Sequence, residues 1–422
     1  MEQVQDSAVL LDNRPEDDKE EHRNSISNAQ TTLPLPSLKD VPLSNSNDFP
    51  TAIEYDLEDE YDIKKHIISA STHILVIYYE PSNELLYLKM WKSLYDRVYD
   101  TSEVTKRQNY LVDGLAFNCR FAPDVHLGII PIRRLDDGTV SLGRLIEKPI
   151  KSQLEANVEY AAVMRRLHDE WQLSFQLERG IFSHESDFTF LAREVVRIHQ
   201  QLKTSPYPEM GGTEWLYKKL QFVIDQLRDF LEQRPLFYEE CQDMIDILLR
   251  TYELYKIEGH FNRRREKGHI KHCHGDLKAA NLWIHPGCKE KKQLQHLLAL
   301  DCIDFNHPEF CHIDTLSDVA MLAVDIETYL TYLLGKEKGQ HLVKGFLNSY
   351  LEAMDEKGEE IEPLLEYYMT EKAIVCASTT FFYDHIAPNE IDTTRVKKYL
   401  KVAMTHACEL RKLLWYTAYY SS

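Results

Sequence analysis

The fold of this chain is indicated most strongly by residues 272–283, which read His-Cys-His-Gly-Asp-Leu-Lys-Ala-Ala-Asn-Leu-Trp. Downstream, an apolar run at 297–300 leads into a second motif, Asp301-Cys302-Ile303-Asp304-Phe305. A His-Gly-Asp triplet alone is weak, because polar loops of this kind occur by accident in helical proteins. Here an asparagine follows the aspartate after five positions, and an Asp-x-x-x-Asp-x-Ala pattern stands at 314–320. This combination is specific enough to assign candidate site residues.

The two motifs carry a candidate base and candidate metal ligands. The carboxylate of Asp276 can accept the hydrogen bond of a substrate hydroxyl and take its proton. The amide oxygen of Asn281 is a hard ligand of the kind that suits Mg²⁺. In the second motif Asp304 is the favoured metal ligand and Asp301 is its rival. If the strand stays extended, their odd spacing puts the two side chains on opposite faces, so only one of them reaches the metal.

Four further residues are expected to support the site. We expect His274 to hydrogen-bond the backbone and hold the loop rather than to transfer protons. Lys278 lies two residues after Asp276, where its ammonium could neutralise charge on a γ-phosphate; the alternative is a solvated surface lysine. Asp314 and Asp318 stand one helical turn apart at the start of a predicted helix, where they could cap it or accept donors from the loop. We expect Asp318 to play such a structural role.

The composition is that of an acidic globular protein. The 422 residues are 43% hydrophobic and 28% charged, with a formal net charge of −19. Such a surface repels nucleic-acid backbones and anionic membranes, and no apolar run approaches the ~18 residues that span a bilayer. The eight cysteines form no close C-x-x-C pair, which favours reduced thiols in an intracellular protein. The N-terminus reads as neither a secretory nor a mitochondrial signal, so we expect a cytoplasmic protein without nucleic-acid or membrane partners.

Hydropathy divides the chain into three parts. Residues 1–50 are predicted to be a disordered polar arm, in which Leu33-Pro34-Leu35-Pro36 is either a docking motif for a protein partner or only linker. Residues 51–164 are β-like and residues 165–422 are mostly helical. Turns are predicted at 81–83 and 136–138. The predicted strands are 73–79, 84–91, 125–132 and 140–142, and the predicted helices are 102–117, 188–202, 214–232, 238–257, 315–334, 340–354, 361–384 and 394–414.

The region around the first motif is also rich in histidine and cysteine. Zinc sites favour paired spacings such as C-x₂₋₄-C with H-x₃₋₅-H, whereas the spacings here are irregular. We therefore expect most of these residues to be loop or core positions rather than zinc ligands. They are His269, His272, Cys273, His274, His285, Cys288, His307, Cys311 and His312.

The two motifs resemble the catalytic loop and metal-binding segment of the aminoglycoside phosphotransferase / choline kinase-like family, whose fold is related to that of protein kinases. Within this family the chain is most similar to an uncharacterised, mostly bacterial branch. Three segments carry the similarity: Asn118–Ile132 resembles N-R-x-L-A-P-D-x-Y-L-G-V-x-P-I, Val158–Leu167 resembles V-E-Y-A-V-K-M-R-R-L, and Asp301–Ala323 resembles D-x-I-E-F-N … I-D-x-x-x-D-x-A-F-L-A.

The resemblance implies an α+β protein with a bilobal protein-kinase-like fold, made of a small β-rich N-lobe and a larger α-helical C-lobe. It makes residues 157–164, which are ambiguous by periodicity, the last strand of the N-lobe. A hinge near Met164 would then bind the adenine of ATP through its backbone. It also implies that Lys89, or else Lys92, contacts the α- and β-phosphates; the alternative is a solvated strand lysine. ATP and Mg²⁺ are the implied cofactors.

The chain departs from the family pattern around this lysine. No glycine-rich phosphate loop precedes Lys89, since residues 69–73 read Ser-Ala-Ser-Thr-His. The helix that follows lacks the expected glutamate partner, and Asp113 and Glu103 are the nearby acids. The identity of the acidic partner is therefore open.

Four functions are compatible with these residues. The leading one is an ATP- and Mg²⁺-dependent phosphotransferase that transfers the γ-phosphate to a hydroxyl of a small molecule. A protein Ser/Thr kinase is favoured by Lys278, which stands where the bacterial branch has His, but the span from Asp304 to Asp318 leaves little room for an activation segment. A nucleotide-binding pseudokinase is favoured by the missing acidic partner. Nucleotidyl transfer on the same fold is the fourth.

Overall fold

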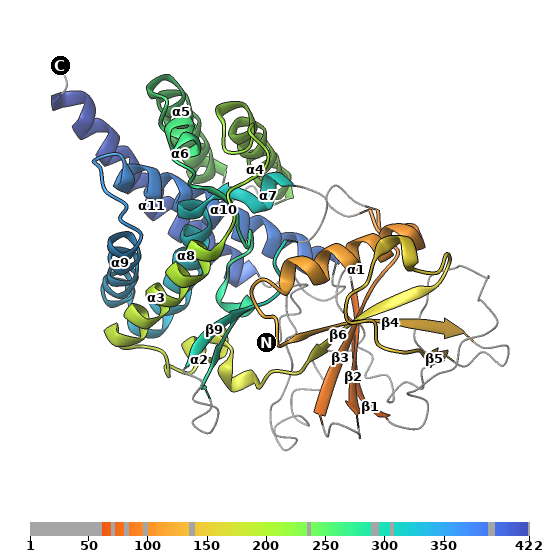
Figure 1. Ribbon diagram of the computed structural model, residues 1–422. Coiled ribbons are helices and arrows are strands. Elements are labelled where there is room, and N and C mark those ends of the chain that lie inside the picture. The colour runs from red at the N-terminus through yellow and green to blue at the C-terminus, as the bar shows by residue number, and fades with distance from the viewer. Residues whose placement is uncertain are drawn as a thin grey trace. The chain divides into compact units, whose positions relative to one another are not determined.

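The computed structural model describes residues 61–68, 72–79, 84–95, 100–134, 140–233, 238–287, 295–303, 308–386 and 393–420. The chain divides into two compact units, of which the first comprises Met1–Asp169 with Ala299–His307 and the second Glu170–Leu298 with Pro308–Ser422. The first unit holds the main sheet and the second holds most of the helices (Figure 1). The predicted α+β class, with a β-rich part followed by a helical part, is confirmed. The predicted arm at 1–50 lies outside the described residues.

The first unit is built on a six-stranded antiparallel sheet. Its strands are β1 (Tyr61–Ile68), β2 (Thr72–Tyr79), β3 (Glu84–Trp91), β4 (His126–Arg134), β5 (Val140–Leu142) and β6 (Glu159–Arg165). They lie in the order β1-β2-β3-β6-β4-β5. The predicted β2–β3 hairpin is confirmed, and the ambiguous segment 157–164 is confirmed as a strand, which pairs with β3 and β4. The predicted turns at 81–83 and 136–138 lie outside the described residues.

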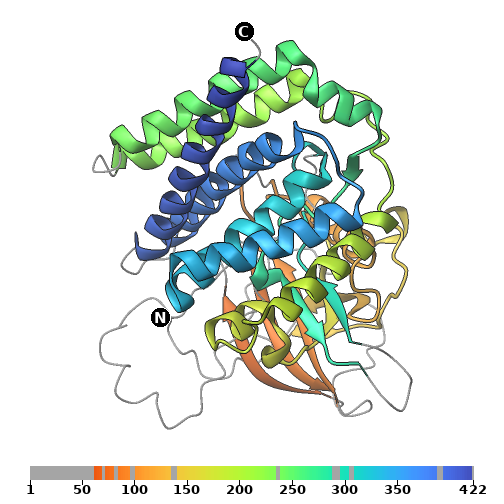
Figure 2. The same cartoon turned by 90° about the vertical axis from the view of Figure 1, so that its left-hand side faces the viewer.

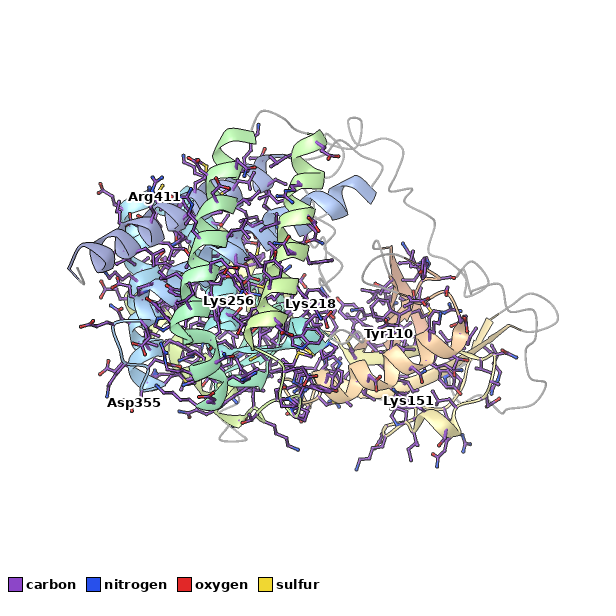
Figure 3. All side chains as sticks on the ribbon, turned by 90° about the horizontal axis from the view of Figure 1, so that it is seen from above. Tyr110, Lys151, Lys218, Lys256, Asp355 and Arg411 are labelled. Atoms are coloured by element: carbon purple, nitrogen blue, oxygen red, sulfur yellow. The ribbon has the colours of Figure 1, made fainter. Side chains whose placement is uncertain are left out.

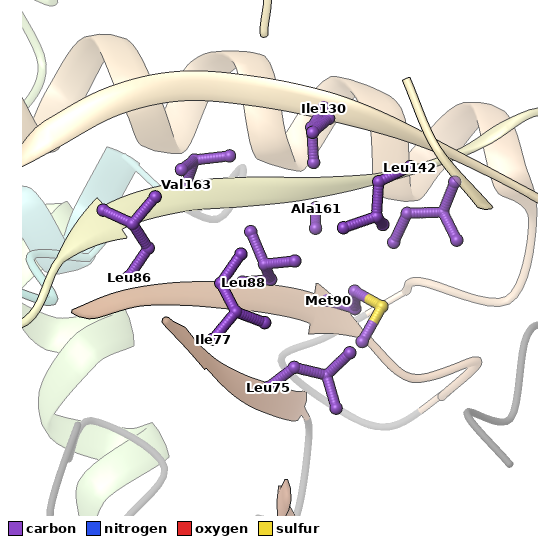
Figure 4. Close-up of a cluster of buried hydrophobic side chains, with 10 residues drawn as sticks. Leu75, Ile77, Leu86, Leu88, Met90, Ile130, Leu142, Ala161 and Val163 are labelled. Atoms are coloured by element: carbon purple, nitrogen blue, oxygen red, sulfur yellow. The ribbon is translucent and has the colours of Figure 1, made fainter. Parts of the chain in front are cut away.

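The sheet buries apolar side chains on both faces. On one face, Leu75, Leu88 and Val163 belong to a cluster of alternate strand residues (Figure 4). On the other face, Leu115 of helix α1 (Val104–Asn118) packs against the sheet. Because successive side chains of a strand point to opposite faces, burial on both sides requires the nearly continuous apolar runs found in β2 and β3.

Helix α1 is fixed to the sheet by a buried ion pair. The guanidinium of Arg107 donates to the two carboxylate oxygens of Glu159 on β6, at 2.6 and 3.2 Å. The two side chains are 2% and 8% exposed. A pair this deeply buried is stable only while both partners are present, because either charge alone would be desolvated without compensation. At this position α1 therefore directs an arginine, and not an acidic side chain, toward β6.

The second unit is a helical assembly (Figure 2). Its helices are α2 (Leu173–Glu178), α3 (Glu185–Gln201), α4 (Thr213–Gln233), α5 (Tyr238–Glu258), α6 (His260–Glu266), α7 (Pro308–Cys311), α8 (Thr315–Leu334), α9 (Lys336–Ala353), α10 (Ile361–Ile386) and α11 (Thr393–Tyr420). The seven helices predicted after residue 168 are confirmed, and α8 has the predicted bounds. Helix α8 is buried along most of its length and packs against α9, α10 and α11.

Two short sheets interrupt the helices. Strand β7 (Ile270–His272) pairs with β10 (His312–Asp314), and β8 (Leu282–His285) pairs with β9 (His296–Ala299). The chain between β7 and β8 is the first motif, and β10 leads directly into α8. These pairings fix the start of α8 and both ends of the loop between β7 and β8, which we call the motif loop.

The segment after β9 differs from the prediction. Strand β9 ends at Ala299, and Asp301 has a φ of 56°, so the backbone is not extended at Asp301. The condition for strand alternation between Asp301 and Asp304, an extended backbone, is therefore not met at Asp301. The segment also groups with the first unit, since Lys89 bonds Asp301 and the side-chain oxygen of Asn118 accepts the N–H of Cys302.

A buried histidine gives the helical unit a predicted sensitivity to alkaline pH. His406 of α11 contacts Glu327 of α8 at 2.8 Å and Glu366 of α10 at 2.7 Å. Burial lowers the pKa of His406, but the two carboxylates outweigh burial and raise that pKa to about 10, from 6.5. The folded chain thus holds a proton that the unfolded chain releases between pH 6.5 and 10. The resulting stabilisation is fully present below pH 6.5 and is lost as the pH rises through 10.

We expect urea denaturation to show a free energy of unfolding that falls between pH 7 and 10, with a shallower fall in His406→Gln. Other groups titrate in this range, so the difference between the two curves isolates His406. An exposed pair, His341 with Glu185, provides the control variant His341→Gln, which should keep the wild-type slope. Equal slopes in all three proteins would contradict the assignment.

The described residues contain no helix with the length and apolar character needed to cross a bilayer. Among the described cysteines no disulfide is formed.

Candidate active site

The loop between β7 and β8 carries the first motif. Gly275 has a φ of 83°, a left-handed conformation that costs glycine little because it has no Cβ. The loop then closes in a 3-10 turn at Ala279–Asn281, where the N–H of Asn281 donates to the carbonyl of Lys278 at 2.9 Å. This turn brings the Asn281 side chain back to Asp276.

The carboxylate of Asp276 is held by two side chains of its own loop. Asn281 Nδ2 donates to Oδ2 of Asp276 at 3.0 Å and to its main-chain oxygen at 2.9 Å. The Lys278 ammonium lies 3.1 Å from Oδ1, and the N–H of Asp276 donates to Nδ1 of His274 at 3.3 Å. The Asp276 side chain is still 23% exposed. The carboxylate is therefore fixed in orientation and yet partly open to solvent. His274 bonds the backbone, in agreement with its expected role.

Asn281 has the arrangement of a metal ligand. The residue is fully buried, and both hydrogen bonds to Asp276 come from its Nδ2. Its Oδ1 accepts no hydrogen bond from any part of the chain that the structure describes. Buried amide oxygens are rarely left in this state. A hard oxygen with this placement fits Mg²⁺, which takes carbonyl and carboxylate oxygens.

Lys278 is not a solvated surface lysine, so that alternative is wrong. The residue is only 8% exposed. Burial lowers the pKa of Lys278, but the charge of Asp276, with further contributions from Cys376 and Asp325, outweighs burial and raises that pKa. The ammonium therefore stays charged at neutral pH in a mostly dehydrated position. There its charge acts with little screening on any anion bound near Asp276.

Asp318 of α8 organises the start of the loop. Its two carboxylate oxygens accept the N–H groups of His274 at 3.2 Å and Gly275 at 3.0 Å. His199 lies 3.1 Å from Oδ2 and is itself bonded to the hydroxyl of Tyr350 at 2.7 Å. Burial raises the pKa of Asp318, but His199, His274 and Gly275 outweigh it and lower that pKa, so the carboxylate stays ionised. The expectation that Asp318 supports the loop agrees with these bonds, and Asp314 caps α8 as proposed.

Two contacts of the loop were not predicted from the sequence. Asp325 Oδ2 accepts the N–H of Ala279 at 2.7 Å, and Gln172 Nε2 donates to the carbonyl of Ala280 at 2.7 Å. A signal for Asp325 exists, since it follows Asp318 by seven residues, two helical turns, and all six residues between them are apolar. No comparable signal marks Gln172, which is far from the loop in sequence.

In the first unit, Lys89 pairs with an acid of the second motif. Its ammonium lies 2.7 Å from Oδ1 of Asp301, and the two side chains are 14% and 11% exposed. The acids considered from the sequence have other partners, since Asp113 pairs with Lys151 and Glu103 with Lys106. Asp301 therefore takes the position of acidic partner for Lys89.

The remaining candidates of the first unit are placed as follows. Met164 is buried on β6, between His126 of β4 and Tyr87 of β3. The next two N–H groups, of Arg165 and Arg166, already donate to main-chain carbonyls, so these two donors are not available to an adenine ring. Asp304 lies outside the described residues, and its role as metal ligand stays a prediction.

Loss of Asp318 should both destabilise the chain and disorder the loop. In Asp318→Ala, His199 and two loop N–H groups lose their acceptor in a dry environment, and we expect the free energy of unfolding to fall by about 3–5 kcal/mol. Urea denaturation at neutral pH measures this. In Asp187→Ala, a residue that caps the start of α3, only about 1 kcal/mol should be lost. Equal effects of the two substitutions would contradict the role given to Asp318.

Comparison with known proteins leaves the family open. No protein-family model matches the chain, and no curated protein matches it. Among solved structures, the chain is similar to an ethanolamine kinase of Plasmodium vivax, with a TM-score of 0.44 and 12% sequence identity over 85% of each chain. A likeness at this level does not establish membership. The resemblance to the choline kinase-like family, and to its bacterial branch, stays a prediction from the motifs.

Proposed function

We propose that the chain is an ATP- and Mg²⁺-dependent phosphotransferase that transfers the γ-phosphate to a hydroxyl of a small molecule. The observation that carries the proposal is the orientation of Asp276, whose two carboxylate oxygens are held separately by Lys278 and Asn281. Phosphoryl transfer depends mostly on positioning and charge stabilisation, which such a fixed constellation supplies.

Each residue has one task in this reaction. Asp276 orients the acceptor hydroxyl and takes its proton as the oxygen attacks the γ-phosphorus. Lys278 places a charge beside the transferring group, and Lys89 neutralises the α- and β-phosphates. Asn281 and Asp304 are the residues that would hold Mg²⁺. When bound, this ion would neutralise charge on the β- and γ-phosphates.

The two alternatives within the kinase class gain less from the structure. A protein kinase needs an activation segment, but α7 and β10 already occupy Pro308–Asp314, immediately before α8. A pseudokinase was favoured by the missing acidic partner, and the Lys89–Asp301 pair now supplies an acid. A small-molecule acceptor is therefore the favoured proposal. A cytoplasmic location, and a protein partner for the 1–50 arm, stay expectations from the sequence.

The proposal is tested by incubating the full chain with ATP, Mg²⁺ and a mixture of small-molecule alcohols and amino alcohols, and identifying the nucleotide product by mass spectrometry. We expect ADP, and no turnover when Mg²⁺ is chelated. AMP or pyrophosphate would indicate nucleotidyl transfer instead. Nucleotide binding that persists without turnover across the mixture would favour the pseudokinase.

A further inference from the structure

A second cluster of potential metal ligands lies beside the motif loop, on the β7–β10 sheet. From it we propose that His272, Cys311 and His312 form a binding site for a zinc-like divalent cation. The site uses none of the residues assigned to ATP or Mg²⁺, so it does not depend on the proposed function. One ligand atom from each of the three residues lies within 4.8 Å of the other two.

The fold brings these residues together in a defined way. His272 of β7 and His312 of β10 are directly opposite in the antiparallel register, and their rings stack with centroids 4.2 Å apart. Cys311 is the last residue of α7 and directly precedes β10. In a tetrahedral zinc site, bonds of about 2.0–2.3 Å put neighbouring ligand atoms roughly 3.3–3.8 Å apart. Side-chain rotations that close about one ångström would complete the site.

The chemistry of the ligands selects the ion. Two imidazoles and one thiolate are borderline and soft donors, which favour Zn²⁺ and disfavour Mg²⁺. Cys311 and His312 are buried and His272 is partly exposed, so an ion has a route of entry. On binding, the thiol of Cys311 releases its proton to solvent and donates as thiolate.

In the proposed site, water would take the fourth coordination position. A cavity of about 20 Å³ is lined by His312 and Glu309, among others. That volume accommodates one water molecule. Three protein ligands plus one water give the coordination of four that zinc prefers.

The position of the site indicates its effect. His272 is separated from Asp276 by only three residues, and the N–H of Cys273 donates to the carbonyl of Cys311 at 2.7 Å. An ion bound here would cross-link the strand that enters the loop to the strand that leads into α8. Such an ion stabilises the folded state in proportion to its occupancy, because the unfolded chain does not preform the site.

The proposal departs from the sequence-based expectation for these three residues. They were expected to be loop or core positions because their spacing along the chain is irregular for zinc. Spacing rules apply to ligands on one local segment, whereas strand pairing joins His272 to a residue forty positions away. A sequence without known pairing cannot reveal such a site.

The test uses the full chain freed of metal by a chelator and titrated with Co²⁺, a spectroscopic probe that takes the same ligands as Zn²⁺. We expect one Co²⁺ per chain with a thiolate-to-cobalt charge-transfer band, displacement by Zn²⁺, and a higher melting temperature with Zn²⁺. Excess Mg²⁺ should not displace the Co²⁺. The charge-transfer band is the deciding signal, since oxygen ligands such as Asn281 cannot produce it.

Matched variants separate this site from adventitious binding. Cys311→Ser should abolish the charge-transfer band, and His312→Gln should weaken binding beyond the roughly 10–100-fold that loss of an outer partner costs. The first control is Cys241→Ser, which removes a buried thiol of α5. The second is His285→Gln, which removes one ring of the stacked His285–His296 pair. No cysteine among the described residues joins that pair to form a group of three ligands. Both controls should bind as wild type. Absence of the band in the wild type, or its persistence in Cys311→Ser, would overturn the proposal.

Discussion

Replacing Asp276 by Asn is expected to lower kcat for phosphoryl transfer by about 10²–10⁴-fold, the usual contribution of a general base. The amide cannot take the proton of the acceptor hydroxyl. The main-chain oxygen of residue 276 still accepts the hydrogen bond from Asn281, so the backbone of the loop should persist. We therefore expect KM for ATP to change little, and a steady-state assay that varies ATP and acceptor separately measures both constants.

The chain offers a matched control for this substitution. Asp355 pairs with Lys357 in the same Asp-x-Lys spacing as Asp276 and Lys278, but both side chains are 79% exposed (Figure 3). Asp355→Asn should leave kcat unchanged. A modest loss in Asp276→Asn, equal to that of the control, would show that Asp276 is not the base.

Replacing Lys89 by Met should lower kcat/KM for ATP by about 10²–10³-fold, the cost of losing one preorganised charge donor. Replacing Asp301 by Asn should cost less, on the order of tenfold, because an amide oxygen still accepts the lysine hydrogen bond. Neither substitution should change the Mg²⁺ concentration that gives half-maximal rate, since Asp301 serves Lys89 and Asp304 is the proposed metal ligand.

The Mg²⁺ dependence decides between the two acids. A large increase in the Mg²⁺ requirement of Asp301→Asn, with none in Asp304→Asn, would make Asp301 the metal ligand and contradict this division of roles. Lys151→Met removes the exposed Lys151–Asp113 pair of the same unit (Figure 3 labels Lys151) and should leave every constant unchanged.

Much of the fold could be predicted because its signals are local. Helix α8 was predicted with its observed bounds, since twenty residues of helical pattern are bracketed by a capping aspartate, Asp314, and a glycine, Gly335. The β2–β3 hairpin was predicted from two apolar runs joined by a turn. The segment that became β6 was ambiguous by periodicity because both faces of a central strand are buried, and only the resemblance assigned it.

The arrangement of the motif loop could be predicted for the same reason, since Asp276, Lys278 and Asn281 lie within six residues. What the sequence did not reveal are contacts between distant segments. Lys89 and Asp301 are 212 positions apart, and the two acids considered from the sequence, Asp113 and Glu103, pair elsewhere. The predicted extended strand does not continue through Asp301, whose left-handed backbone conformation carries no signal in the hydropathy pattern.

The most direct test of the central claim is to follow radiolabelled γ-phosphate from ATP in the presence of Mg²⁺ and a mixture of hydroxyl-bearing small molecules. Wild-type protein and Asp276→Asn are compared, and the label is separated into nucleotide, free phosphate, small-molecule and protein fractions. The proposed function predicts label in the small-molecule fraction with the wild-type protein and almost none with Asp276→Asn. Label confined to protein, or equal transfer by both proteins, would contradict it.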